Sequence, residues 1–185
     1  MFNLLKILVS LLIVISTFAH SSSLLLMSND IAQGEFMGKN HEFNGFGCSG
    51  DNLSPHLRWI NAPKGTMSFA ITAYDKDAPT GSGWWHWQIV NIPKNITEIT
   101  TGSGNVTRNS APLGSLQINN DYSTQGFGGA CPPVGHGLHH YRFTIHALSV
   151  DKLELPADAS GALVGYIINA NTIESSSIEA LYKRD

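Results

Sequence analysis

Tyr74-Asp75-Lys76-Asp77-Ala78-Pro79 closes one apolar run, and Trp84-Trp85-His86-Trp87-Gln88-Ile89-Val90-Asn91-Ile92-Pro93 follows it after a short glycine-containing turn. Two carboxylates stand at the end of the first run, and a histidine among tryptophans opens the second. A third segment, Gly137 to Phe143, places adjacent histidines at the head of another alternating run. Carboxylates, imidazoles and aromatic rings at strand ends are the components of a small polar pocket. The three segments therefore predict a binding site as well as a sheet.

Strand signals dominate the middle of the chain. Residues 68–74 are rich in β-formers, and the run from Trp87 to Ile92 is closed by a proline. From 139 to 148, a mostly apolar set that begins with His139 and Tyr141 alternates with a mostly polar set that begins with His140. This period of two predicts a half-buried strand in which His139 and Tyr141 face the core and His140 points away.

The pattern changes near the C-terminus. Within 160–171, apolar side chains recur at helical spacing, and Asp158 is a candidate N-cap. Alternating residues around 178–182 then predict a last short strand. Many strands separated by turn-rich loops, one late helix and no low-complexity linker predict a single, mostly β, antiparallel domain.

The N-terminus is typical of an export signal. Lys6 is the only charge before Asp30, and the apolar run that follows it, 7–18, is too short to span a membrane. We predict a signal peptide over 1–19, with cleavage after Ala19, or after Ser21 as a second candidate. The alternative is an uncleaved anchor. Residues 20–185 then form the folded domain, in the periplasm or outside the cell.

Export affects the interpretation of the two cysteines, Cys48 and Cys131. In an oxidising compartment two cysteines more often form a disulfide than stay free, so we predict that they are joined. Two buried free thiols are the alternative.

Charge and motifs exclude several classes of function. Lys and Arg total 11 against 14 Asp and Glu, and no basic run stands out, so nucleic acid is not an expected partner. Gly45 to Gly50 matches G-x-G-x-x-G, but a loop rather than a helix follows it, so it does not predict a nucleotide site. The sequence contains no G-x-S-x-G, Walker A, HExxH or CxxC motif.

Two other kinds of site use the same residues. Asp75, His86 and His139 have the residue types of a two-histidine, one-carboxylate metal site, but they come from separate strand ends without diagnostic spacing. We therefore predict no metal. The four tryptophans could also form an aromatic cage for an ammonium group, although aromatic residues beside strands usually belong to the core.

Five segments in register resemble the phosphatidylethanolamine-binding protein family, also called Raf kinase inhibitor-like proteins, and most closely its bacterial YbhB/YbcL type. The segments span most of the chain after the signal peptide, and they are 54–59 (Ser-Pro-His-Leu-Arg-Trp), 75–79 (Asp-Lys-Asp-Ala-Pro), 86–93, 128–133 (Gly-Gly-Ala-Cys-Pro-Pro) and 137–141 (Gly-Leu-His-His-Tyr).

The resemblance implies an antiparallel β-sandwich with short peripheral helices, one C-terminal helix and a small anion-binding pocket at one end. For bacterial members it implies homodimers and no established enzymatic activity. We expect no cofactor. The residues that it assigns to the pocket as polar groups or rim are Asp75, His86, His139, Tyr141, Asp77, Pro79 and Gly129.

The chain departs from the family pattern at two positions. Lys76 stands where the family usually has proline between the two aspartates, which removes a fixed φ from the turn. His140 stands where eukaryotic members usually have arginine, so contacts with eukaryote-type partners do not carry over.

We therefore expect an exported, non-catalytic protein that binds small phosphoryl or similar anions, including phospholipid head groups. His86 and His139 would donate hydrogen bonds to the oxyanion, Tyr141 would add its hydroxyl, and Asp75 would orient an imidazole. Because a carboxylate repels a neighbouring anion, Asp75 lies behind a histidine or contacts an ammonium group, and the sequence leaves both open.

Two other classes of function remain as alternatives. In one, the protein has a protein partner and acts as an inhibitor of a protease or signalling enzyme, or as an exported effector. In the other, it is a metal-dependent enzyme that uses the same histidines and aspartate.

Overall fold

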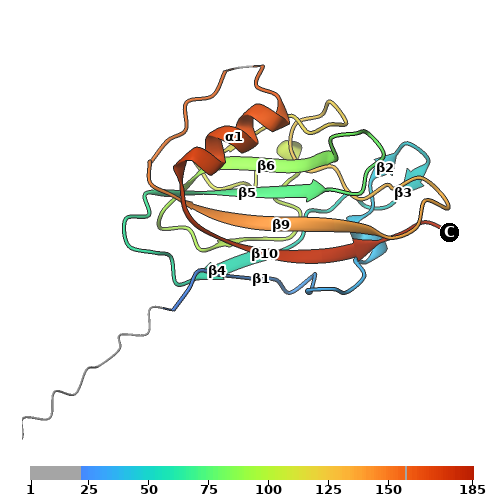
Figure 1. The fold of residues 1–185 in the computed structure, drawn as a ribbon, viewed down its shortest axis with the longest axis horizontal. Coiled ribbons are helices and arrows are strands. Elements are labelled where there is room, and N and C mark those ends of the chain that lie inside the picture. The colour runs from blue at the N-terminus through green and yellow to red at the C-terminus, as the bar shows by residue number, and fades with distance from the viewer. Residues whose placement is uncertain (1–21, 157) are drawn as a thin grey trace, which may run out of the picture.

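A five-stranded antiparallel sheet forms the centre of the molecule (Figure 1). The structure is a computed structural model that describes residues 22–156 and 158–185. The predicted signal peptide, residues 1–19, and Ser21 lie outside the described residues. The strand order in the sheet is β10-β9-β5-β6-β8. The strands are β5 (Ser68–Asp75), β6 (Trp84–Pro93), β8 (Leu116–Gln117), β9 (His139–Leu148) and β10 (Thr172–Tyr182).

A smaller antiparallel sheet packs on one face of the central sheet, and a helix covers the other face (Figure 1). The small sheet contains β1 (Leu25–Met27), β4 (Leu57–Ile60) and β7 (Glu98–Ile99), in the order β1-β4-β7. A separate hairpin joins β2 (Asn44–Gly45) to β3 (Cys48–Ser49). The helices are α1 (Gly161–Asn171) and two short 3-10 turns, η1 (Lys39–His41) and η2 (Val106–Arg108). This is the predicted β-sandwich with short peripheral helices and one C-terminal helix.

The two layers produce two hydrophobic cores. Between the sheets, Trp59 of β4 packs edge-on against Phe69 of β5, and both side chains are fully buried. Between the central sheet and α1, Val164 and Ile168 of the helix pack with apolar residues of β5, β6 and β9. The burial of large apolar side chains on both faces explains why the central strands contain long apolar runs.

Strand register brings the chemically distinctive segments together. Asp75, the last residue of β5, pairs with Trp84 at the start of β6 and with Tyr141 near the start of β9. Because both neighbouring strands run antiparallel to β5, they begin where β5 ends. The carboxylate, the tryptophan cluster and the histidines therefore meet at one end of the sheet.

The structure corrects three details of the predicted elements. The cap of α1 is Ser160, whose side chain accepts a hydrogen bond from the Leu163 N–H, and it is not Asp158, because the helix begins only at Gly161. Strand β6 begins at Trp84, and β10 begins at Thr172, so both are longer than predicted.

Alternation of burial holds only in the first half of β9. Tyr141 is buried and Arg142 is exposed, but His146 and Leu148, which belong to the set predicted to face away from the core, are buried as well. The cause is α1, which covers this part of the outer face. Among the described residues, no helix is long and apolar enough to cross a bilayer.

Candidate ligand-binding site

A cavity of about 180 Å³ lies at the end of the central sheet where β5 stops. Its deep end is formed by four polar side chains that are at least nine-tenths buried: Asp75, His86, His139 and Tyr141. They come from three adjacent strands that register holds side by side.

The Asp75 carboxylate lies behind His139. Its Oδ2 accepts a hydrogen bond from His139 Nδ1 at 2.6 Å, and its Oδ1 accepts one from the backbone N–H of Asp77 at 2.8 Å. A carboxylate only accepts, so Nδ1 of His139 carries the hydrogen. Of the two arrangements that the sequence left open, the structure has the one in which Asp75 orients an imidazole.

The second nitrogen of His139 is also engaged. Its Nε2 lies 2.8 Å from Nδ1 of His136, an exposed histidine on the preceding loop. Asp75, His139 and His136 thus form a hydrogen-bonded chain from the buried end of β5 to the surface. The sequence analysis missed His136, and the signal for it was its spacing of three residues from His139 across a turn that Gly137 closes at positive φ.

His86 has a different hydrogen-bonding role from the expected one. Its Nδ1 donates to the carbonyl of Gly128 at 2.7 Å, while Nε2 has no hydrogen-bond partner among the described residues. Burial lowers the pKa of His86, and the Gly128 hydrogen bond and the charge of Asp75 oppose this only in part. In the neutral ring Nε2 is therefore an acceptor, and it becomes a donor only when the ring takes up a proton.

Tyr141 and Trp84 carry unused hydrogen-bond donors. Both residues line the cavity, and neither the hydroxyl of Tyr141 nor Nε1–H of Trp84 has a partner within the described chain. Burial, followed by the charge of Asp75, raises the pKa of Tyr141, so its hydroxyl is neutral. The Asp75 carboxylate lies close enough to influence this pKa, but it makes no hydrogen bond of ordinary geometry with the hydroxyl. A buried donor without a partner costs roughly 1–3 kcal/mol, which a ligand that accepts from it would recover.

The mouth of the cavity is apolar and largely aromatic. Phe46, Trp84 and Tyr122 form one part of it, with ring centroids 5.3 Å apart for Phe46 and Tyr122 and 5.1 Å apart for Trp84 and Tyr122. Pro79 and Pro133 also line it. The sequence analysis considered Trp84 only as part of an ammonium cage and did not identify Phe46 or Tyr122, because their role depends on loops that fold back from distant positions.

Two of the predicted pocket residues do not line the cavity. Asp77 Oδ2 accepts hydrogen bonds from the backbone N–H and from Nδ1 of His140, at 2.8 and 2.6 Å. Gly129 lies in a loop, where its N–H donates to Asn52 at 2.7 Å and a Cβ would sit 2.3 Å from the His41 carbonyl oxygen. Asp77 therefore holds the turn after β5, and Gly129 allows its loop to pack closely against the backbone of residues 41–43.

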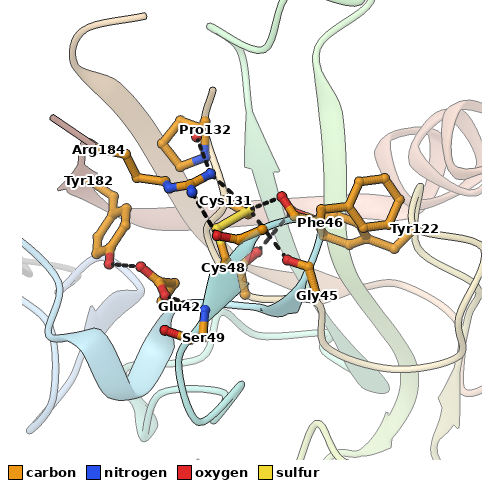
Figure 2. Close-up of a disulfide and its surroundings, with 12 residues drawn as sticks. Glu42, Gly45, Phe46, Cys48, Ser49, Tyr122, Cys131, Pro132, Tyr182 and Arg184 are labelled. Atoms are coloured by element: carbon orange, nitrogen blue, oxygen red, sulfur yellow. Dashed lines mark hydrogen bonds between the residues drawn. A yellow bond between two sulfur atoms is a disulfide. The ribbon is translucent and has the colours of Figure 1, made fainter. Parts of the chain in front are cut away.

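The predicted disulfide is present. Cys48 and Cys131 are joined across 83 residues of sequence, and the bond connects the β2–β3 hairpin to the loop before β9 (Figure 2). Within residues 22–156 and 158–185, no three histidine, cysteine or acidic side chains gather in a way that could hold a metal ion.

Comparison with known proteins gives matches over most of the chain. Residues 27–183 match the family model described as phosphatidylethanolamine-binding protein. The chain is 46% identical over 178 residues to the UPF0098 protein YbcL of Escherichia coli, covering 96% of this chain and 97% of YbcL. It is 45% identical to YbhB of the same organism over 157 residues, covering 85% of this chain and 98% of YbhB.

Structural comparison agrees. The crystal structure of E. coli YbcL, described as a new member of the mammalian PEBP family, superposes with a TM-score of 0.86 at 47% identity, covering 89% of this chain and all of the YbcL chain. The chain is also 39% identical over 116 residues to the putative lipoprotein LppC of Mycobacterium tuberculosis, covering 63% of this chain and 53% of LppC.

Proposed function

The chain belongs to the phosphatidylethanolamine-binding protein family, and on that premise we propose that it is an exported, non-catalytic protein that binds a small ligand through a phosphoryl or similar oxyanion group. The observation that supports this most is the hydroxyl of Tyr141, which is buried at the deep end of the cavity without a hydrogen-bond partner among the described residues. A group that accepts from this hydroxyl removes the cost of leaving it unpaired.

The donors and acceptors around the cavity determine which protonation state of the oxyanion they can bind. Tyr141 and Trp84 donate, whereas the neutral His86 ring accepts through Nε2. A phosphomonoester monoanion matches this set because its P–OH donates to His86 while its other oxygens accept. A sulfonate or phosphodiester has no such hydrogen, so its binding requires His86 to take up a proton.

Asp75 and His139 act as support. His139 is held from both sides, by Asp75 at Nδ1 and by His136 at Nε2, so its contribution is to fix the floor of the cavity beside Tyr141. This placement keeps the Asp75 carboxylate behind an imidazole and away from the bound anion, whose charge it would repel.

Export is supported by two independent observations. Cys48 and Cys131 form a disulfide, which persists in oxidising compartments, and the relative LppC is named a putative lipoprotein. We propose a periplasmic or secreted location, with residues 1–19 removed as a signal peptide, and the homodimer that the family resemblance implies.

Calorimetric titration with methanesulfonate, an anion of fixed charge, tests this function. Tyr141→Phe should weaken binding about tenfold, because it removes a single donor, without lowering the midpoint of thermal unfolding. Tyr166→Phe is the matched control, since Tyr166 is exposed on α1 and does not line the cavity. Equal affinities of wild type and Tyr141→Phe, or no binding of methanesulfonate, inorganic phosphate or a phosphomonoester to the wild type, would contradict the proposal.

Acidity gives a second test. Bound methanesulfonate raises the pKa of His86. The affinity for methanesulfonate should therefore be greatest below the lowered His86 pKa of the free protein, and it should fall as pH rises towards and through the His86 pKa of the complex. A phosphomonoester monoanion brings its own proton and should not require uptake by His86. Proton uptake measured from the buffer dependence of the binding enthalpy separates the two ligands.

A further inference from the structure

Phe46 occupies an unusual position at the cavity mouth. It lies between Gly45 and Gly47, and all three residues have positive φ, which a bulky side chain rarely adopts. Its side chain is 73% exposed, yet it lines the cavity and its ring meets the edge of Tyr122 at 5.3 Å. A strained, exposed aromatic residue beside a cavity indicates a functional constraint on its position.

Two crosslinks fix the loop that carries Phe46. The disulfide joins Cys48 to Cys131, which itself lines the cavity, and Sγ of Cys131 lies 3.6 Å from the Phe46 carbonyl oxygen (Figure 2). Because a disulfide sulfur has no hydrogen, this is a packing contact rather than a hydrogen bond. Arg184 supplies the second crosslink.

The Arg184 guanidinium bridges the same two loops beside the disulfide. It donates to the carbonyl of Gly47 at 2.7 Å and to the carbonyl of Pro132 at 3.2 Å (Figure 2). Gly47 precedes Cys48 and Pro132 follows Cys131 in the sequence. Its own carbonyl accepts from the Gly135 N–H at 3.0 Å. The bifurcated geometry of a guanidinium suits this double contact, which a lysine could not reproduce.

The base of the hairpin is tied to β10 as well. Buried Glu42 accepts from the Ser49 N–H at 2.7 Å and from the Tyr182 hydroxyl at 2.5 Å (Figure 2). Glu42 thus connects Ser49 of the hairpin to Tyr182, the last residue of β10, and Arg184 follows two residues later. The position of Phe46 is thus determined by the disulfide, by Arg184 and by Glu42 together.

We propose that Phe46 is a specificity-determining residue that selects ligands carrying an apolar or aromatic substituent on the oxyanion, and that Arg184 is the residue that positions it. This inference rests on the proposed function. Asp75, His86, His139 and Tyr141 are the most buried polar residues of the cavity, whereas the more exposed rings of Phe46, Trp84 and Tyr122 form its mouth. An oxyanion bound at Tyr141 directs its substituent towards these rings, where burial of apolar surface stabilises it.

Methanesulfonate and benzenesulfonate provide the test, because they have the same charge and differ in the substituent. Wild type should bind benzenesulfonate about tenfold or more tightly than methanesulfonate, since a phenyl group buries more apolar surface than a methyl group. Phe46→Ala should reduce this ratio at least about threefold, because the phenyl group loses more buried apolar surface than the methyl group does. Phe36→Ala is the matched control, because Phe36 is also exposed, at 58%, but does not line the cavity.

Arg184→Met should lower the same ratio while the protein remains folded, because the Gly47 and Pro132 carbonyls lose their shared donor. Lys183→Met is the control, since Lys183 is exposed and pairs only with Asp185 within the described chain. Equal ratios in wild type, Phe46→Ala and Arg184→Met would overturn the inference while leaving the anion site intact. If neither sulfonate binds the wild type although inorganic phosphate or a phosphomonoester does, the inference fails and the proposed function stands. If none of these anions binds, the proposed function itself fails.

Discussion

Two aspartate–histidine pairs connect the end of β5 to the start of β9, and they have the same geometry in different surroundings. Asp75 pairs with His139 and Asp77 with His140, each with 2.6 Å between Nδ1 and Oδ2. The side chains of the first pair are 3% and 1% exposed, whereas both side chains of the second are 30% exposed. The two aspartates are two residues apart in the sequence, and the two histidines are adjacent.

The difference between the pairs follows from burial. Water screens the outer pair, so its ionic attraction contributes little, and its role is to hold the turn that carries Pro79. The inner pair is buried away from water, so the removal of either side chain leaves an uncompensated polar or charged group in the interior. Identical chemistry thus supports a cavity floor in one place and a surface turn in the other.

The largest expected effect separates the two aspartates by stability. Asp75→Ala should lower the free energy of unfolding by about 3–5 kcal/mol, because it breaks a buried pair. Asp77→Ala should cost about 1 kcal/mol, because the lost pair is partly solvated. Urea unfolding of both variants measures the contrast, and similar losses would show that burial does not distinguish the pairs.

A buried histidine without a carboxylate sharpens the comparison. Burial of His146, whose ring lies between Thr72 of β5 and Thr172 at the end of α1, lowers its pKa to about 4. Below its ordinary pKa of 6.5 the unfolded chain binds a proton that the folded chain does not, so stability falls as pH drops from 6.5 towards 4. Over this window the loss amounts to about 3 kcal/mol.

His146→Gln should remove that part of the acid sensitivity. Unfolding experiments at pH 7 and pH 4.5 should give a smaller stability loss for His146→Gln than for wild type, while His86, whose pKa is also lowered, contributes equally to both. His140→Gln should keep the wild-type difference. An unchanged stability loss in His146→Gln would mean that the His146 ring is solvated in the folded wild-type protein.

Ligand affinity should distinguish the two adjacent histidines. His139→Ala removes the support beside Tyr141 and should weaken methanesulfonate binding about tenfold, which corresponds to roughly 1.4 kcal/mol. His140→Ala should have little effect, because His140 contacts Asp77 outside the cavity lining. Titration calorimetry with folded variants measures both, and a comparable loss at His140 would place the anion elsewhere.

The smallest expected effect is the pH dependence of the outer pair. Burial raises the pKa of Asp77, but hydrogen bonds from the His140 ring and backbone outweigh it and lower the pKa below 3.8. The stability from this pair is therefore complete above the unfolded pKa and is lost as pH falls through the lowered one. Carboxyl NMR titration should show the shift relax in His140→Ala, and an unshifted Asp77 in the wild type would contradict the pairing.

Some features of the molecule were predictable from sequence because they depend on local periodicity. Alternation in β9 separated His139 from His140, and the two histidines do lie on opposite sides, one in the cavity floor and one in the outer pair. Two cysteines behind a predicted export signal indicated the disulfide that the structure contains. The five family segments also identified the fold, because their order and spacing constrain the whole domain.

Other features could not be predicted because they depend on contacts between distant segments. Thr144 and His146 are buried beside Gly165 and Ile168 of α1, although their polarity suggested an outer face. His136 reaches His139 through the path of a loop, and Tyr122 enters the cavity from a segment with no strand signal.

The sequence by itself determined the strands, the pairing of the cysteines and the residue types available at the end of the sheet, because these follow from side-chain periodicity and composition. Only the tertiary structure decided what those residues do. Packing made the Gly128 carbonyl the partner of His86 Nδ1, so that Nε2 of the neutral ring faces a ligand as an acceptor and not as a donor. Packing also left the Tyr141 hydroxyl without a partner among the described residues. Hydrogen-bond direction and burial are set by neighbours in space, and the sequence does not specify them locally.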